Sequence, residues 1–441
     1  MDHGAGAGAG TAEATTTSLQ HLNDDMVAEI LLRLPSASVF RCRAVCRAWR
    51  GITSSPGFVA AYARRRPLEL IVQRHGANGV LDTIPLALGD EEEEARRCLH
   101  PGYPGCEIVP GLFNSGYSLV ASCVDGGLLL FERFMHDVSL YLVCNPVSRQ
   151  WVIVPLHSRR MTRPCALYVH RPSGEHRLLL LANDDECNGW GKWASHYVRS
   201  LEAAETRRLQ GPAVTGIYMC DRMVIHSLEH RGRLHWLDDH PEAKATGTVL
   251  AFDTVSETFR RMARPPPLRN GNGNDHREFK GGGELSLCLL EMDGRLAVAA
   301  ILGGSMDVWV LQDYDDDESW AHRHRVDCLP PPFLQTRWVI NANAGQHKNN
   351  NNNDVIIVLQ DSSGSWVGLY DLSNKRLLKQ IQVISDPRED GRIFYSTHLN
   401  ALLFRDTIQR HSFFDLRKSI FQFPDSDYSI FSEVLNLQCV I

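Results

Sequence analysis

Residues 22–58 read LNDDMVAEILLRLPSASVFRCRAVCRAWRGITSSPGF, and this stretch decides how the front of the chain folds. In its first part, apolar side chains recur at the spacing i, i+3, i+4 and i+7, which places them along one face of a helix. These residues are Val27, Ile30, Leu31 and Leu34. The spacing therefore predicts that the front of the chain contains an amphipathic helix.

Capping residues set the expected ends of this helix and the start of the next one. Asn23 is suited to cap the first helix, Pro35 to end it, and Ser36 to cap a second. A third stripe at the same spacing consists of Val45, Ala48, Trp49 and Ile52. Residues 58–66 predict one more short helix. A three-helix unit over residues 19–66 has too small a core to be stable alone, so we expect a partner to complete it.

After residue 67 the pattern changes from helical spacing to short apolar runs between Gly, Pro, Asn and Asp residues. Such runs are typical of β-strands. They lie at residues 68–74, 127–131, 140–145, 151–156, 177–182, 248–253, 296–302, 308–313, 355–360 and 365–371. Because no long amphipathic helix separates them, we expect residues 67–441 to form a large all-β domain.

An imperfect internal repeat favours a β-propeller for this domain. Asn145, Asp253 and Asp371 each end an apolar run, and a large apolar residue follows six positions later. This pattern predicts hairpins in which the Asx side chain bonds its own turn. A Gly turn before apolar residues also recurs, at residues 126–128, 232–234 and 294–296. We expect six to eight blades, some of them degenerate, and unrelated hairpins in a large β-sandwich are the alternative.

The net charge of −6 is unevenly distributed along the chain. Residues 19–66 contain eight Arg against three acids and therefore have a charge of +5, whereas residues 1–18 have −2 and residues 67–441 have −9. A basic head suggests an acidic partner. The acidic body argues against nucleic-acid binding, which requires a basic face.

Composition places the chain among soluble intracellular proteins, in the cytoplasm, the nucleus or both. The first residues have no basic flank or apolar stretch, so they do not resemble a secretory signal, and residues 1–18 are expected to be a disordered tail. No apolar run is long enough to cross a membrane. The 12 cysteines form no C-x-x-C pair, which favours reduced thiols over disulfides or a zinc site.

Sequence motifs of catalysis are absent, and no cofactor or metal is expected. The chain has no H-E-x-x-H, G-x-S-x-G, phosphate-binding or dinucleotide-binding motif. Asp313, Asp315 and Asp317 imitate the start of a calcium loop, but Glu318 stands where Gly must turn. His322 and His324 lack a second ligand pair, so a metal site is not expected there.

Residues 22–58 closely resemble the F-box motif. The matching positions are Leu22, Ile30, Leu31, Leu34, Pro35, Arg41, Val45, Cys46, Trp49, Ile52 and Phe58. Asn23 departs from the usual Pro, but Asn also caps helices well. The later stretches CNPVSRQWVIVP, GRLHWL, GTVLAFDTVSETFRRM and MDVWVLQDY are similar to the F-box-associated, kelch-like propellers of plant F-box proteins.

The resemblance implies a non-catalytic subunit of a Skp-cullin-F-box ubiquitin ligase. The head would bind a Skp-family adaptor and through it a cullin, and the propeller would recruit an unknown target protein. Carried over by position, the residues that pack internally or onto the adaptor are Leu22, Ile30, Leu31, Leu34, Pro35, Val45, Cys46 and Trp49. Two alternatives remain open: an F-box scaffold that does not promote target degradation, and a propeller enzyme with an F-box attached.

Overall fold

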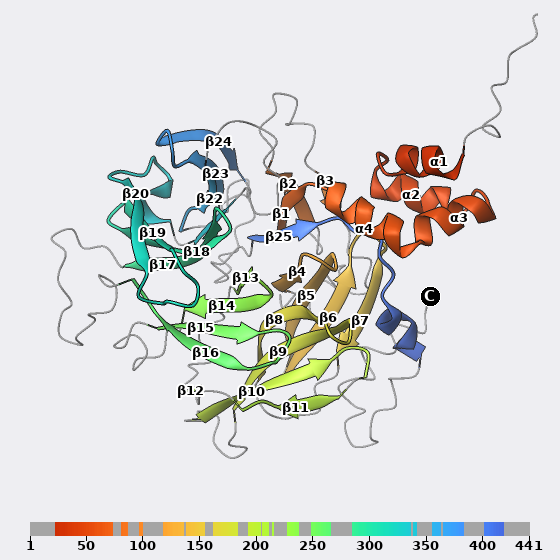
Figure 1. Cartoon of the computed structure of the whole chain (residues 1–441), viewed down its shortest axis with the longest axis horizontal. Helices are drawn as coiled ribbons and strands as arrows, with labels where there is room; N and C mark the ends of the chain where they lie inside the picture. The colour runs from red at the N-terminus through yellow and green to blue at the C-terminus, as the bar shows by residue number, and fades with distance from the viewer. Residues whose placement is uncertain are drawn as a thin grey trace, which may run out of the picture. The chain divides into compact units, whose positions relative to one another are not determined.

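The computed structural model divides the chain into two compact units, residues 1–65 and 66–441, each of which has its own core. Figure 1 shows the helices in the first unit and the strands in the second. The structure describes residues 23–73, 81–86, 97–99, 118–135, 138–154, 162–183, 193–203, 205–210, 214–215, 227–237, 248–265, 285–336, 338–341, 355–362, 365–382 and 401–418. The predicted tail at residues 1–18 lies outside these ranges, as do residues 345–354, whose Asn-rich sequence predicts a polar loop.

The described part of the first unit consists of four short helices. They are α1 (Asp24–Leu31), α2 (Ser36–Cys42), α3 (Arg47–Ser54) and α4 (Pro56–Arg65). Asn23 caps α1 as expected, because its Oδ1 accepts a hydrogen bond of 2.8 Å from the Met26 amide. The three predicted helices and the further short helix are therefore all present.

Three details of the predicted helices are wrong. The first helix ends before Leu34, which lies in the turn ahead of Pro35, and Val45 lies in the turn ahead of α3 rather than in a helix. Ser36 is the first residue of α2 and does not cap it, because Pro35 occupies the cap position. The Ser36 hydroxyl instead lies 3.1 Å from the Tyr62 hydroxyl, so long-range packing outweighs the local capping preference.

The described part of the second unit contains six antiparallel sheets, here called blades 1 to 6 and given from their inner to their outer strand. Blade 1 consists of β25 (Ala401–Arg405), β1 (Leu68–Gln73), β2 (Leu81–Pro85) and β3 (Arg97–Leu99). Blade 2 consists of β4 (Ser118–Cys123), β5 (Leu128–Met135), β6 (Val138–Asn145) and β7 (Gln150–Val154). Blade 3 consists of β8 (Thr162–His170), β9 (Glu175–Asn183), β10 (Trp193–Ser200) and β11 (Thr206–Arg208), with β12 (Val214–Thr215) also paired to β10.

The remaining blades follow the same plan. Blade 4 consists of β13 (Leu228–His230), β14 (Arg233–Leu237), β15 (Thr248–Asp253) and β16 (Phe259–Ala263). Blade 5 consists of β17 (Ser286–Met292), β18 (Arg295–Leu302), β19 (Ser305–Leu311) and β20 (Trp320–Val326). Blade 6 consists of β21 (Trp338–Asn341), β22 (Ile356–Gln360), β23 (Trp366–Asp371) and β24 (Arg376–Gln382). Two 3-10 helices, η4 (Phe333–Gln335) and η5 (Ser412–Lys418), complete the described elements.

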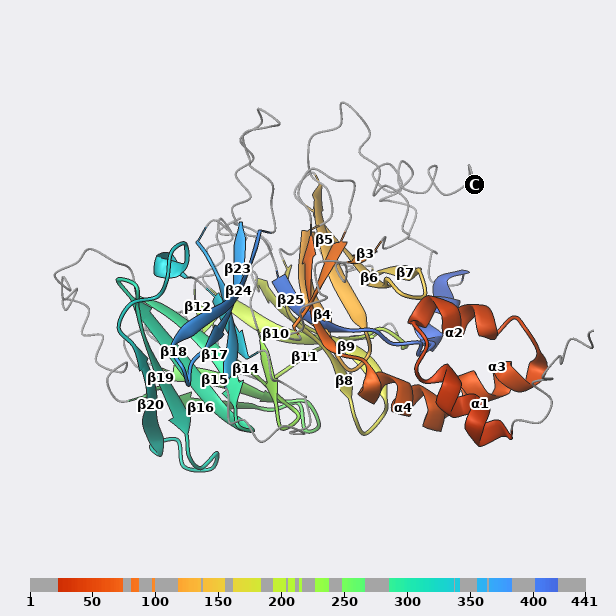
Figure 2. The same cartoon turned by 90° about the horizontal axis from the view of Figure 1, so that it is seen from above.

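The ring closes within blade 1, where β25, the last described strand, meets the first strands of the unit. β25 pairs antiparallel with β1, with Leu403 opposite Leu70, so one blade combines the last strand with the first three. Figures 1 and 2 show the blue β25 beside the orange β1. This closure of six sheets into a ring confirms the propeller, fixes the blade number at six, and excludes the β-sandwich.

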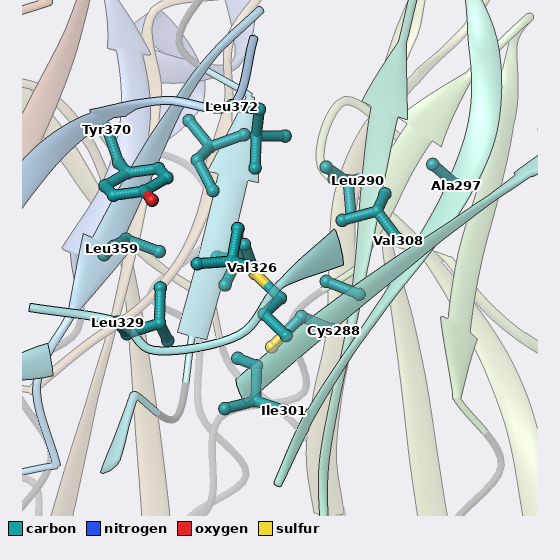
Figure 3. Packing of buried hydrophobic residues seen from close by; sticks show 14 of the residues in the cluster. Cys288, Leu290, Ala297, Ile301, Val308, Val326, Leu329, Leu359, Tyr370 and Leu372 are labelled. Atoms are coloured by element: carbon teal, nitrogen blue, oxygen red, sulfur yellow. The ribbon is translucent and has the colours of Figure 1, made fainter. Parts of the chain in front are cut away.

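The core lies between the blades. Six apolar clusters each join two consecutive blades, and the cluster of blades 1 and 6 completes the circle. Figure 3 shows the cluster between blades 5 and 6, where Leu290 and Val308 face Leu359 and Tyr370. Burial of one such side chain contributes about 1.5–3 kcal/mol. The middle strands are therefore apolar on both faces, as their sequences suggested.

The repeated hairpins occupy equivalent positions in alternate blades. Asn145 Oδ1 accepts hydrogen bonds from the amides two and three residues on, at 3.0 and 3.1 Å, and Asp253 Oδ1 does the same at 2.9 Å. Asp371 Oδ1 accepts one from the Asn374 amide at 3.0 Å. These turns join the two outer strands of blades 2, 4 and 6, which confirms the predicted Asx hairpins. In blade 3 the Ser200 hydroxyl takes the same role, 3.0 Å from the Ala203 amide.

Because they are rich in turn-forming residues, the segments 181–193 and 264–283 are predicted from the sequence to be loop insertions, and the first of them is only partly a loop in the described residues. β9 continues to Asn183 and β10 begins at Trp193, so the ends of the segment 181–193 belong to strands. Of the segment 264–283, only residues 264 and 265 are described, and they follow β16.

Candidate functional site

The helical unit is built around a few fully buried side chains. Leu31 of α1, Val39 of α2 and Tyr62 of α4 are at most 1% exposed, and Phe58 stacks 6.1 Å from Tyr62. The Tyr62 hydroxyl donates a 2.9 Å hydrogen bond to the Leu34 carbonyl. This bond fixes the turn between α1 and α2, in which Leu34 lies half-buried.

An ion pair joins the first and last helices of the unit. Arg65 donates hydrogen bonds of 2.9 Å to both carboxylate oxygens of Glu29, and Arg33 donates another of 3.2 Å. The hydrogen bond from Arg65 is the main reason why the pKa of Glu29 lies below its usual value. Because these groups are exposed, the pair fixes geometry more than it adds stability.

A second set of bonds positions the turn between α2 and α3. Arg43 donates a 2.8 Å hydrogen bond to the Thr53 carbonyl, and Arg50 Nε donates one of 3.1 Å to the Arg43 carbonyl. Burial lowers the pKa of Arg43. Cys46 caps α3, because its sulfur accepts a bond of 3.4 Å from the Trp49 amide. These hydrogen bonds fix the turn between α2 and α3, in which Val45 lies exposed.

Three large apolar side chains of this small unit point into solvent. Met26 is 52%, Ile30 48% and Val45 64% exposed. Met26 and Ile30 are four residues apart and so share one face of α1. Only three other large apolar side chains in the described ranges are at least 40% exposed, and they are spread over the propeller. The helical unit therefore concentrates apolar surface that a partner could cover.

The structure distributes the eight predicted adaptor-binding residues between the core and the surface. Leu31 is core, Leu34 and Trp49 are half-buried, and Leu22 lies outside the described residues. The exposed members are Ile30, Pro35, Val45 and Cys46. Ile30 and Val45 are thus not core residues, a reading that the sequence had left open. Met26 was not anticipated, although its spacing of four from Ile30 could have indicated it.

The same unit exposes most of its positive charge. Six of its seven arginines are exposed, namely Arg33, Arg41, Arg47, Arg50, Arg64 and Arg65. Only three acidic side chains lie in residues 19–66 to balance them. An acidic partner with apolar contacts would therefore match this surface in both charge and polarity.

Within the described ranges, no group of three or more His, Cys, Asp and Glu side chains is placed to hold a metal ion. His322 Nε2 lies 2.8 Å from Asp307, and the Asp313 side chain accepts a hydrogen bond of 3.0 Å from the Asp315 amide. None of the described helices is long and apolar enough to span a bilayer.

A small helical head with an exposed apolar surface and a six-bladed propeller together define an F-box protein with a C-terminal propeller. Comparison with family models agrees: the F-box domain matches residues 19–60, and the F-box associated beta propeller domain matches residues 113–404. Because the second match covers more than half of the chain, this protein belongs to the family of F-box proteins with an associated β-propeller.

Its relatives include F-box proteins of Arabidopsis thaliana. The F-box protein At5g49610 of Arabidopsis thaliana is 24% identical over 68% of this chain and 77% of its own length. The F-box/kelch-repeat protein At3g23880 of the same species is 22% identical over 85% of this chain and 94% of its own. Among solved structures, a chain of the nidogen/laminin complex matches with a TM-score of 0.38 at 8% identity, covering 71% of this chain and 93% of its own.

Proposed function

We propose that this chain is the substrate-recruiting subunit of a Skp-cullin-F-box ubiquitin ligase. In this proposal the helical unit binds a Skp-family adaptor, the adaptor connects it to a cullin, and the propeller holds a target protein. The family to which the chain belongs supports this role.

The observation on which the proposal rests is the exposed apolar surface of Met26, Ile30 and Val45. Full burial of such a side chain contributes about 1.5–3 kcal/mol, and because each of these is about half exposed, covering it contributes roughly half of that. The uncovered set is therefore costly for a unit with so small a core. The exposed arginines around it favour an acidic partner and would accelerate association. In this proposal the partner is a Skp-family adaptor, which is acidic and would cover the apolar surface.

In this role the chain itself needs no catalytic group. Holding a target close to a ubiquitin-charged enzyme raises the effective concentration of the target's amines, which is sufficient to increase the rate of transfer. The six-bladed ring offers rigid support for target-binding loops.

Calorimetry with the full chain and a purified Skp-family adaptor tests the adaptor contact. Ile30→Asp and Val45→Asp should each weaken binding about a hundredfold, because a charge would be buried against apolar surface. Val255→Asp is the matched control, since Val255 is 48% exposed like Ile30 but lies on the propeller. The proposal would be contradicted if the adaptor does not bind the wild-type chain, or if it binds the Ile30→Asp variant as tightly as the wild type.

Target turnover separates recruitment from scaffolding. In cells, a Leu34→Asp, Trp49→Ala double variant should lengthen the half-life of a protein that crosslinks to the propeller. If that half-life stays unchanged while the variant loses the adaptor, the chain acts as a scaffold.

A further inference from the structure

The chain continues beyond the strand that closes the ring. Residues 406–418, here called the C-terminal strap, follow β25 and end in η5. β25 is the inner strand of blade 1, whereas η5 packs against β7, the outer strand of blade 2. Figure 1 shows the dark-blue η5 beyond β7. The strap therefore passes along blade 2 from its inner to its outer strand.

The first part of the strap fits against the turn between β4 and β5. Gly127 in this turn has a φ of +58°, and a Cβ there would collide with Thr407 Cγ2 and lie 3.1 Å from the Arg405 carbonyl. Thr407 and Ile408 are both 1% exposed. Only glycine permits so close an approach between the strap and blade 2.

The middle of the strap contacts blades 2 and 3 together. His411 Nε2 lies 3.0 Å from the Gly126 carbonyl of blade 2, and its ring centre lies 4.6 Å from that of His176 on β9 of blade 3. Burial lowers the pKa of His411 to about 3, so its ring is neutral at ordinary pH and Nε2 donates to the carbonyl. His176 is held in turn by Glu202, 3.0 Å from its Nδ1.

Two aromatic side chains then fill the seam between these blades. Phe413 and Phe414 are 1% and 6% exposed. They share an apolar cluster with residues of blade 2 and blade 3, among them Tyr141, Val152, Val154, Leu178, Leu180 and Leu201. Among the buried members of the six clusters in the described part of the chain, only these two phenylalanines come from a segment that lies neither in the two joined blades nor in the chain between them.

We propose that the C-terminal strap is a second latch of the ring, which seals the seam between blades 2 and 3 separately from the pairing of β25 with β1. One continuous segment, residues 401–418, thus holds blade 1 through its strand and the seam between blades 2 and 3 through its strap. Release of the strap opens that one seam while the β-sheet closure stays intact. The end of the described chain therefore controls a local opening of the propeller.

Hydrogen exchange measured by mass spectrometry on the full chain tests this latch. The double variant Phe413→Ala, Phe414→Ala should exchange about a hundredfold faster or more in β4 and β8, with little change in β17 and β21. Phe333→Ala is the matched control, because Phe333 is equally buried between blades 5 and 6 and should give the opposite pattern. An equal increase in all six blades, or none at the seam of blades 2 and 3, would overturn the proposal.

A suppressor pair tests the contact without removing core residues. Gly127→Ala should speed exchange at the same seam, because its Cβ displaces Thr407. Adding Thr407→Ser removes the colliding Cγ2 and should restore part of the protection. The Gly174→Ala variant controls for backbone strain, since Gly174 has a φ of +73° with nothing within 4 Å of a Cβ. If Thr407→Ser gives no recovery, or if Gly174→Ala exposes the same seam, the strap does not act as a latch.

Discussion

His196 shows how one buried residue links the stability of the propeller to pH. It lies on β10 in an aromatic setting, with its ring 4.4 Å from Phe259 and 6.4 Å from Trp236. Burial lowers its pKa from 6.5 to about 4. The folded protein therefore keeps this imidazole neutral, whereas the unfolded chain takes up a proton near pH 6.5.

The sign of the pH dependence follows from this difference. Between pH 6.5 and about 4 the unfolded chain binds more protons than the folded one, so the free energy of unfolding falls as the pH falls. For His196 the full loss is on the order of 3 kcal/mol. His196→Phe should reduce the loss measured by urea unfolding between about pH 7 and pH 5. A variant as sensitive to acid as the wild type would assign the effect to other groups, such as His235.

At the residue scale, prediction from sequence succeeded where neighbouring residues determine the contacts of a side chain, and it failed where packing against distant residues determines them. Asn23 caps its helix because the cap needs only the next three residues. Ser36 also has a good capping side chain, but Tyr62, which is 26 residues away, binds it instead. For the same reason the apolar spacing could not separate the core residue Leu31 from the exposed Ile30.

The repeated hairpins share one backbone conformation, although the residues at the equivalent position differ. Four residues after each Asx, the chain adopts a left-handed conformation: φ is 56° at Arg149, 54° at Glu257 and 52° at Lys375. Glu257 is retained there by its contacts across the blades, since it accepts hydrogen bonds from the Tyr168 hydroxyl at 2.6 Å and from Arg177 at 2.8 Å. The side chain at position 375 is exposed.

We expect Lys375→Gly to stabilise the propeller by up to about 1 kcal/mol, because glycine adopts a positive φ without steric cost. Arg149→Gly should act in the same direction for the same reason. Arg376→Gly is the control, since this exposed strand residue has ordinary dihedral angles and glycine there should destabilise by about 0.5–1 kcal/mol. Thermal unfolding of the three variants measures the differences. A loss of stability in Lys375→Gly would show that the lysine side chain stabilises its turn.

Element-scale prediction recovered both middle strands of blades 2, 5 and 6 but only one middle strand of blades 1, 3 and 4. The runs at residues 296–302 and 308–313 correspond to β18 and β19, which neighbouring blades cover on both faces. The inner strands β13 and β21 and the outer strand β20 were missed. β20 reads WAHRHRV and exposes its charged residues, so it has no continuous apolar run. Strands of this kind are defined by their partner strand rather than by their own composition.

At the scale of the whole molecule, the ring depends on contacts that local patterns do not encode. The pairing of Leu70 with Leu403 joins opposite ends of the propeller and fixes the number of blades. The sequence indicated a propeller through repeats in blades 2, 4 and 6 but could only bound the number between six and eight. The long-range closure of the ring also implies slow folding, because loop-closure entropy must be overcome before β25 can pair with β1.

The two units differ in core size, and this difference predicts how the molecule unfolds. The helical unit buries only a handful of apolar side chains, whereas the propeller has six connected clusters. Calorimetry of the full chain should therefore show two transitions, with the helical unit melting first.

Adding a Skp-family adaptor at about a hundred times its Kd should raise only the first transition, by about 10 °C or more, because binding stabilises the folded unit by about 2.7 kcal/mol and small domains gain several degrees per kcal/mol. Ile30→Asp should abolish this shift and leave the propeller transition in place. A single cooperative transition would contradict this prediction, because it would show that the two units unfold together. An adaptor that raises the propeller transition by the same amount would also contradict it, because the partner would then stabilise both units and not the helical unit alone.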